Sequence, residues 1–310
     1  MVSLGFRIEE EKAMAIRLKE RRDTWEMREG DEIAPGLTAL QLLGGGTRYE
    51  AFLAFDEQLH HATVAKMLRP HLIEDEGALR ALHDEARLLA SLNHPAIARL
   101  LRAAIDHERP HIVLELVEGP RLSTLIRRFG PLEAEQATPL AVEVASALHY
   151  LHGLGTVHLD VKPKNLIMGA PPRLIDLSIA RSLEAAASLK IPVGTDAYMA
   201  PEQCRPEERL VGPAADVWGL GATLHEALRG EPAFPRGSET ESASPAERWP
   251  QLERAPAPLP VWIPSELSEV IGAALAYEAA DRPTAREVAE TVEPLLRRPR
   301  RLLLNRLKPR

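Results

Sequence analysis

The sequence predicts an α+β protein of two lobes, a small lobe built on an antiparallel sheet with one main helix and a larger, mostly helical lobe. Between residues 37 and 68, apolar and polar residues alternate in short runs, which is typical of strands. From about residue 118 onward, apolar residues recur at helical spacing instead. Glu118-Gly-Pro120 interrupts both patterns, so we place the boundary between the lobes after residue 117.

The smaller lobe, residues 31–117, follows a charged extension over residues 1–30 that we expect to be an exposed helix with Met14, Leu18 and Trp25 as its few apolar contacts. The helix expected within the lobe carries apolar residues at helical spacing and ends before Asn93-His-Pro95. We predict strands over 38–43, 50–55, 62–68, 97–101 and 111–116, and this helix over 77–92.

The larger lobe, residues 118–296, contains a helix whose apolar residues lie on one face. A stretch rich in Pro, Ser and Glu predicts a long surface loop over 236–264, and closing helices follow over 267–277 and 285–296. Residues 297–310 form a basic tail with seven Lys or Arg and no acidic residue. The apolar face of the helix named at the start of this lobe is formed by Leu140, Val144, Leu148 and Leu151.

Composition excludes several classes of protein. The 310 residues are 45% hydrophobic, which is enough to bury a core and excludes a disordered chain. The net charge of −7 argues against a nucleic-acid partner. Residues 144–159 form the longest stretch without a charged residue, too short for a transmembrane anchor. A single cysteine, Cys204, and an acidic N-terminus without an apolar core predict a cytoplasmic protein.

The basic tail has two interpretations. It is either a solvated segment with a short helix docked on the helical lobe, or a contact for an acidic partner or an anionic membrane surface.

Two groups of residues in the smaller lobe are candidates for a functional site. Gly44-Gly45-Gly46 lies between two predicted strands, where glycine lets backbone N–H groups approach a phosphate, although glycine-rich hairpin turns are common without one. Lys66 shares a strand face with Val64 and Leu68 and so needs an anion. Glu85, in the next predicted helix, is a candidate for that anion; otherwise the two are unrelated surface charges.

The third group lies in the run from Val157 to Met168 and in Leu174-Ile-Asp176. It combines a carboxylate that can accept a hydroxyl proton, a lysine for a phosphoryl oxygen, and an Asn/Asp pair suited to Mg²⁺. These requirements of phosphoryl transfer are met by Asp160, Lys162, Asn165 and Asp176.

With these groups in order, and with Gly194-Thr-Asp-Ala-Tyr-Met-Ala-Pro-Glu202, Asp216-Val-Trp218 and Asp281-Arg-Pro283 downstream, residues 34–296 resemble a eukaryotic-type Ser/Thr protein kinase of bacteria. The resemblance implies Mg²⁺-dependent transfer of the ATP γ-phosphate to Ser or Thr hydroxyls of protein substrates, including the chain itself. A pseudokinase that binds nucleotide or acts as a scaffold is the alternative, and a small-molecule phosphotransferase is disfavoured by the segment ending at Glu202.

The resemblance also implies roles for single residues. Thr195 would brace Asp160 and Lys162, Asp216 would hold the catalytic loop, and Glu202 with Arg282 would form a buried ion pair. Catalysis is expected from Asp160, Lys162, Asn165, Lys66 and Glu85; ATP binding from Gly44, Gly45, Gly46, Ala51, Val64, Lys66, the backbone between Glu115 and Val117, Ile167 and Asp176; and Mg²⁺ binding from Asn165 and Asp176.

The chain departs from the family pattern in the nucleotide region. Tyr49 replaces the third glycine of the loop and is expected to stiffen it. Ala51 stands for valine and Val64 for alanine, so the two residues expected above the adenine have exchanged sizes. We expect the adenine pocket to be retained, because an exchange that conserves volume is well tolerated.

Two further departures lie near the catalytic aspartates. Leu159 replaces the arginine that would pair with a phosphate on residues 177–200, which predicts activity without such pairing. Leu177 and Ser178 replace phenylalanine and glycine after Asp176. We expect the serine to make that segment less mobile, because glycine alone reaches positive φ at little cost.

Overall fold

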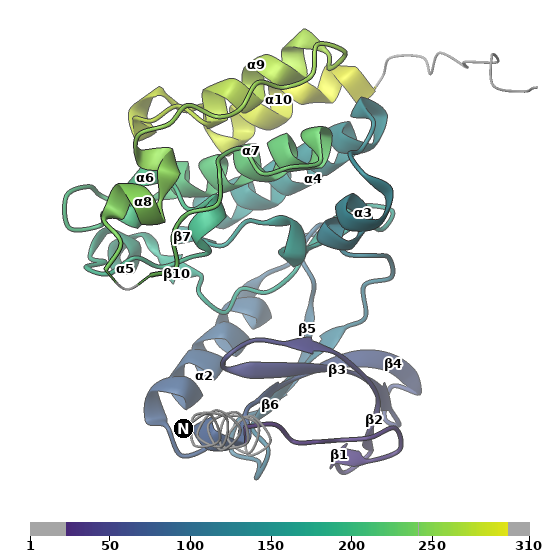
Figure 1. Cartoon of the computed structure of the whole chain (residues 1–310). Helices are drawn as coiled ribbons and strands as arrows, with labels where there is room; N and C mark the ends of the chain where they lie inside the picture. The colour runs from purple at the N-terminus through teal and green to yellow at the C-terminus, as the bar shows by residue number, and fades with distance from the viewer. Residues whose placement is uncertain (1–22, 241, 297–310) are drawn as a thin grey trace, which may run out of the picture. The chain divides into compact units, whose positions relative to one another are not determined.

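The computed structural model describes residues 23–240 and 242–296 (Figure 1). These residues form two compact units. The first comprises residues up to 93 together with 97–117, and the second comprises 94–96 and the chain from 118 onward. One unit is a sheet with a single long helix and the other is mostly helical, which confirms the predicted α+β class.

The first unit is a six-stranded antiparallel sheet in the order β1-β2-β3-β4-β6-β5. A short 3₁₀ turn, η1, and the helix α2 connect β4 to β5. The elements are β1 (Glu32–Ala34), β2 (Leu37–Gly45), β3 (Tyr49–Asp56), β4 (His61–Leu68), η1 (Pro70–Leu72), α2 (Glu76–Ser91), β5 (Leu100–Ala104) and β6 (His111–Glu115).

The two faces of this sheet differ because side chains alternate along each strand. One face is the core of the unit, where Phe52 on β3 lies opposite Ala65 on β4, and Ala65 lies opposite Val113 on β6. The other face carries Ala51 opposite Lys66 and, two residues along β4, Val64. Three of the residues expected to bind the nucleotide, Ala51, Val64 and Lys66, therefore share one face of the sheet.

Residues 23–30 are not helical, which corrects the expectation of a helix over residues 1–30; its first part, with Met14 and Leu18, lies outside the described residues. Trp25 and Met27 pack against the sheet core instead. The Trp25 backbone N–H donates to the Glu50 carboxylate at 3.0 Å and its indole N–H donates to the Leu68 carbonyl at 2.8 Å. Burial of these groups on the sheet outweighs the local helical pattern, since propensity is a weak preference.

Helix α2 begins at an N-cap, where the Asp75 carboxylate accepts the Ala78 N–H at 2.7 Å. Its buried face includes Leu82 and Leu89 and also carries Glu85. Strand β5 lies three residues later than expected, since its pairing with β6 sets its register.

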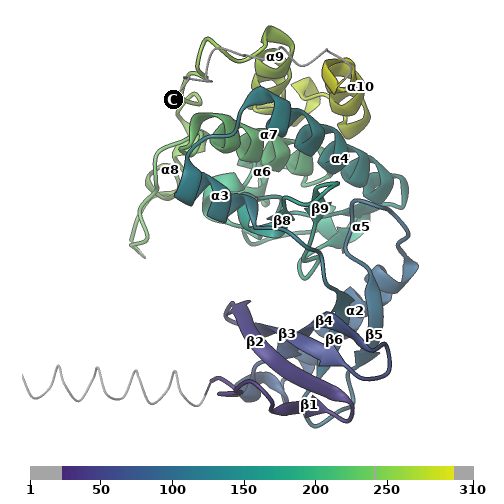
Figure 2. The same cartoon turned by 90° about the vertical axis from the view of Figure 1, so that its right-hand side faces the viewer.

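The second unit is built on α4 and α7, which pack against each other, with α9 and α10 beside them (Figures 1 and 2). Short strands and turns lie between α4 and α7 in the sequence and carry the predicted catalytic residues. The elements are α3 (Leu122–Phe129), α4 (Ala134–Gly153), β7 (Thr156–Val157), η2 (Pro163–Asn165), β8 (Leu166–Ile167), β9 (Arg173–Leu174), β10 (Arg181–Ser182), α5 (Leu183–Ala187), η3 (Asp196–Tyr198), α6 (Pro201–Cys204), α7 (Pro213–Arg229), α8 (Pro245–Arg248), η4 (Pro250–Leu252), α9 (Ser265–Ala274), η5 (Ala279–Asp281) and α10 (Ala285–Leu296).

The segment predicted as a surface loop over 236–264 is partly ordered, which corrects that expectation. It contains α8 and η4, and its Trp249 and Leu252 are buried with Met199 and Cys204. Proline at the first turn of each short helix is compatible with helix initiation, so a proline-rich composition did not exclude helices here. The basic tail, residues 297–310, lies outside the described residues.

Among the described residues, no helix is both long and apolar enough to cross a lipid bilayer.

Candidate functional site

The glycine turn, residues 44–48, closes the hairpin between β2 and β3. Gly44 has a φ of 140°, a conformation that favours glycine. A β-carbon on Gly45 would lie 2.8 Å from the Tyr49 carbonyl oxygen, so only glycine fits there, whereas nothing lies within 4 Å of the corresponding position on Gly46. The turn is therefore tightly folded at Gly45, whereas the space beside the Gly46 α-carbon is open, although the Gly46 N–H itself donates to the Tyr49 carbonyl at 2.9 Å.

Lys66 and Glu85 form the predicted ion pair. The Lys66 ammonium lies 2.7 and 2.8 Å from the two carboxylate oxygens of Glu85, and both side chains are buried. The ring of Tyr49, the residue in place of the third glycine, lies 4.6 Å from the Lys66 ammonium. This distance allows a cation–π contact. The Tyr49 ring therefore covers the Lys66 ammonium, at the position where the family pattern has a glycine without a side chain.

The other nucleotide-site residues of the first unit lie on β3, β4 and β6. Ala51 and Val64 are partly buried on the Lys66 face of the sheet. The Glu115 N–H donates to the Arg99 carbonyl at 3.0 Å, and the Glu115 carboxylate accepts the Arg99 guanidinium at 3.1 Å. Val117 is the last residue of this unit. These contacts hold the end of β6. The expected binding of adenine by the backbone of Glu115–Val117 stays a prediction.

Asp160, Lys162 and Thr195 form a compact hydrogen-bonded group in the second unit. One Asp160 carboxylate oxygen lies 2.6 Å from the Lys162 ammonium, and the other accepts the Thr195 hydroxyl at 2.7 Å. Lys162 also donates to the Thr195 oxygen at 2.6 Å. The expected bracing by Thr195 is thus confirmed, and Asp160 remains partly exposed.

Asn165 and Asp176 are brought together by the β8–β9 hairpin. Asn165 directly precedes β8, Asp176 lies two residues after β9, and the Ile175 N–H donates to the Asn165 carbonyl at 2.9 Å. The Asn165 amide N–H₂ also donates to the Asp160 carboxylate at 3.0 Å. Amide and carboxylate oxygens such as those of Asn165 and Asp176 suit Mg²⁺. Ile167, expected at the nucleotide, is buried in the same hairpin.

The catalytic loop before Asp160 is held from α7. The buried Asp216 carboxylate accepts the N–H groups of His158 at 2.8 Å and Leu159 at 2.7 Å, as expected, and also contacts His152 at 2.9 Å. Leu159 has a φ of 66°, a strained backbone conformation for a leucine. Two hydrogen bonds to Asp216 and burial of the leucine side chain keep that conformation in place.

The segment after Asp176 carries Ser178, whose expected effect, lower mobility of this segment, stays a prediction. Asp176 itself has a φ of 70°, whereas Ser178 is not among the described residues with positive φ. Its N–H donates to the Asp176 carboxylate at 3.3 Å. A serine is therefore tolerated without strain, and Leu177 before it is buried.

Two glutamines that the sequence alone did not indicate connect residues 193–204 to their surroundings. The Gln203 amide donates to the carbonyls of Leu159 and Val193, each at 2.9 Å. The Gln251 amide donates to the carbonyls of Asp196 at 2.7 Å and Met199 at 3.0 Å. Neutral amides that bind backbone carbonyls leave no charge pattern in a sequence, which is why they escaped notice.

The same segment ends on a buried ion pair, as predicted. The Arg282 guanidinium binds both oxygens of Glu202, at 2.7 and 2.9 Å.

Burial, together with the nearby Glu226 carboxylate, raises the pKa of Tyr198, whose hydroxyl donates to Glu226 at 2.5 Å. Burial also raises the pKa of Cys204, so this thiol stays protonated at neutral pH.

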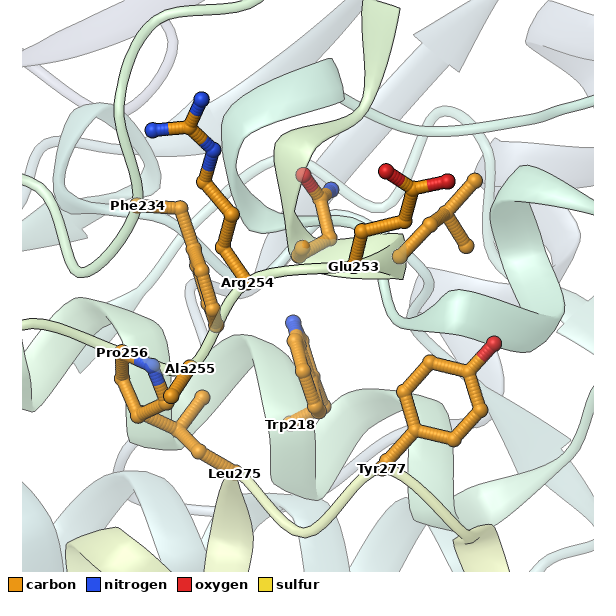
Figure 3. Close-up of a pocket in the computed structure, with 10 residues that line it drawn as sticks. Trp218, Phe234, Glu253, Arg254, Ala255, Pro256, Leu275 and Tyr277 are labelled. Carbon is orange, nitrogen blue, oxygen red and sulfur yellow. The ribbon is translucent and has the colours of Figure 1, made fainter. Parts of the chain in front are cut away.

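A cavity of about 450 Å³ lies elsewhere in the second unit, between α7 and the segment after η4 (Figure 3). Trp218 and Phe234 stack at its wall with ring centroids 5.5 Å apart, and Tyr277 and Leu275 lie opposite the 253–256 segment (Figure 3). None of the predicted site residues lines it. This cavity is therefore separate from the candidate catalytic residues.

Comparison with known proteins finds the model of the "Protein kinase domain" family matching residues 37–292. The chain is 34% identical over 202 residues to the serine/threonine-protein kinase PknB of Mycobacterium leprae, an alignment covering 62% of this chain and 32% of the relative. It is 33% identical over 204 residues to PknB of Mycobacterium tuberculosis, covering 63% and 32%. A probable serine/threonine-protein kinase of Corynebacterium efficiens is 31% identical over 275 residues, covering 82% and 40%. The chain thus spans less than half the length of these curated relatives.

Proposed function

We propose, from the premise that this chain belongs to the protein kinase family, that it transfers the γ-phosphate of ATP to Ser or Thr hydroxyls of protein substrates with Mg²⁺ as cofactor. The observation that carries the proposal is the group formed by Asp160, Lys162 and Thr195. It places a partly exposed carboxylate beside a lysine and a hydroxyl at hydrogen-bonding distance. A group of this kind can accept a proton from an alcohol while a cation faces the phosphate.

The residues of each unit fit the cofactors that the family uses. In the first unit, the ammonium of Lys66, fixed by Glu85, suits phosphate oxygens, and the open space beside the Gly46 α-carbon would admit them. In the second unit, Asn165 and Asp176 would hold Mg²⁺ through amide and carboxylate oxygens. The bound Mg²⁺ would neutralise charge on the phosphates, as it does in phosphoryl-transfer enzymes generally.

The chain's own residues would then act at defined atoms. Asp160 would orient the substrate hydroxyl and accept its proton on a carboxylate oxygen. Lys162 would contact the γ-phosphate oxygens. Thr195 would hold the Asp160 and Lys162 side chains in position by hydrogen-bonding to both. The backbone from Glu115 to Val117 would receive the adenine edge, with Ala51, Val64 and Ile167 as its apolar contacts. Each role is a proposal.

A phosphotransfer assay tests the function. Purified full-length chain is incubated with Mg²⁺ and γ-labelled ATP, alone and with a generic basic protein, beside Asp160→Asn and beside Lys164→Gln. Lys164 is exposed within the same loop, so its variant is the matched control. We expect transfer by the parent and the control, and loss by about a thousandfold or more in Asp160→Asn.

Each other outcome contradicts a stated part of the proposal. Transfer that persists in Asp160→Asn would refute the role of Asp160. No transfer, with MgATP still raising the Tm, would identify a pseudokinase that binds nucleotide. Phosphorylation of small hydroxyl compounds but of no protein would identify a small-molecule phosphotransferase.

A further inference from the structure

Arg69, directly after β4, holds the glycine turn from outside the strand hairpin. Its guanidinium Nε donates to the Gly46 carbonyl at 2.6 Å, and its backbone N–H donates to the Arg48 carbonyl at 2.9 Å. A β-carbon on Gly45 would lie 3.1 Å from the same guanidinium. The side chain of Arg69 thus contacts Gly46, which is expected to meet the phosphates, and its backbone contacts Arg48 in the same turn.

The other end of the same guanidinium binds the segment that precedes the family domain. Arg69 donates to the Asp23 carbonyl at 2.8 Å and lies 3.6 Å from the buried Glu50 carboxylate. Glu50 accepts the Trp25 backbone N–H, and the Trp25 indole donates to the Leu68 carbonyl next to Arg69. This N-terminal segment, residues 23–27, is anchored because Trp25 and Met27 pack on the sheet core.

We propose that Arg69 is a positioning residue for nucleotide binding, which fastens the glycine turn to the N-terminal segment and holds it in one conformation before ATP arrives. The inference deepens the proposed function, since it assumes that the glycine turn binds phosphate. It also means that the functional domain of this chain starts at residue 23 at the latest, fourteen residues before the family match at residue 37.

Physical reasoning supports an effect on affinity rather than on chemistry. A hairpin tip with three glycines loses much conformational entropy when it is ordered around a ligand. The contacts of Arg69 order the tip in the free protein, so that nucleotide binding no longer includes this entropic cost. Hydrogen bonds from a guanidinium are stronger than those from a neutral donor, and 2.6 Å is a short N–H···O distance.

The experiment compares Arg69→Met with Arg80→Met in the full-length chain. Arg80 is an exposed arginine of the same unit whose ion pair within residues 23–240 and 242–296 is with Glu76 on the surface of α2, and so it serves as the matched control. Hydrogen exchange of residues 44–49 is measured without nucleotide by mass spectrometry. The Kd for a non-hydrolysable ATP analogue with Mg²⁺ is measured by calorimetry, and KM for ATP and kcat by phosphotransfer.

We expect exchange at residues 44–49 to become about tenfold faster in Arg69→Met and the Kd and KM to rise about tenfold, with kcat within about twofold of the parent. Arg80→Met should match the parent in all four quantities. Unchanged exchange would overturn the inference, as would faster exchange with an unchanged Kd. A fall in kcat at unchanged KM would also overturn it.

Two further variants separate local effects from misfolding. Arg69→Lys keeps the charge beside Glu50, but its ammonium cannot bind Gly46 and Asp23 at once. We therefore expect faster exchange and a higher Kd and KM, as in Arg69→Met, but a smaller fall in Tm than in Arg69→Met. Trp25→Phe removes the indole donor to Leu68 and part of the ring that packs on the sheet core, and it should loosen residues 44–49 while the chain stays folded. A parent chain that binds no nucleotide would refute the proposed function, whereas the exchange comparison would still decide whether Arg69 holds the turn.

Discussion

Two arginine–glutamate pairs in the second unit allow a direct measurement of what burial does to an ion pair. Arg282 binds Glu202 through two hydrogen bonds and stacks on Trp218, with its guanidinium carbon 4.9 Å from the ring centroid. Arg209 binds Glu278 through two hydrogen bonds and stacks on Tyr277 at 4.7 Å. The ion-pair and ring contacts match, but the side chains of Arg282 and Glu202 are 0% and 2% exposed, against 31% and 59% for the other pair. The buried Arg282 also donates to backbone carbonyls.

We predict that Arg282→Met lowers the free energy of unfolding by about 3–5 kcal/mol, whereas Arg209→Met lowers it by less than about 1 kcal/mol. The difference arises because the first substitution leaves a buried carboxylate without its cation. It also removes donors to three backbone carbonyls, those of Ala214, Ala276 and Tyr277. The second substitution leaves Glu278 in contact with water, which solvates it.

Urea unfolding, followed by circular dichroism in the near and far ultraviolet, measures both variants against the parent. Coincident transitions are required at the two wavelengths, because a chain of two units need not unfold in one step. Combining Arg282→Met with Glu202→Gln should restore at least about 1 kcal/mol, since it removes the stranded charge. Equal destabilisation by Arg282→Met and Arg209→Met would refute the reasoning, because burial would then not control the cost.

Three other predictions concern activity and reactivity. Replacing Ser182 and Ser188 together by alanine should change phosphotransfer by less than about tenfold, because Leu159 offers no arginine to pair with a phosphate there; a larger fall in the labelled-ATP assay would contradict this. Burial raises the pKa of Cys204, so native protein at pH 8 should react with iodoacetamide on the order of a hundredfold more slowly than urea-unfolded protein, and equal rates would show an accessible thiolate. Gly45→Ala should weaken binding of a non-hydrolysable ATP analogue by about tenfold or more in calorimetry, because its β-carbon would lie 2.8 Å from a backbone oxygen; unchanged affinity would mean that the turn adapts freely.

The sequence alone was sufficient to identify the residues whose chemistry is specific. Asp160, Lys162, Asn165 and Asp176 lie within 17 positions, and phosphoryl transfer requires such residue types. The Lys66–Glu85 pair was predictable for a related reason, since a charge on an apolar strand face needs a partner. Alternation of apolar residues likewise identified the strands β2, β3, β4 and β6.

Local pattern failed where distant parts of the chain decide the conformation. Trp25 lies in a segment with helical charge spacing, but packing on the sheet core and a hydrogen bond to Leu68 hold it in a non-helical conformation. Trp249 lies in a proline-rich stretch that reads as loop, and burial beside Met199 orders it. Burying a large aromatic ring stabilises a segment by more than the small local preference for helix or coil.

What the sequence determined by itself is therefore the set of reactive groups, because their chemistry depends on residue type and short spacing. What only the tertiary structure decided is how side-chain donors, charged or neutral, and backbone acceptors hold these groups. Arg69 reaches the Gly46 carbonyl 23 positions away, and Gln203 reaches the Leu159 carbonyl 44 positions away. Every residue except the last carries a backbone carbonyl of this kind, so no residue type marks which one is bound, and the folded chain alone selects it.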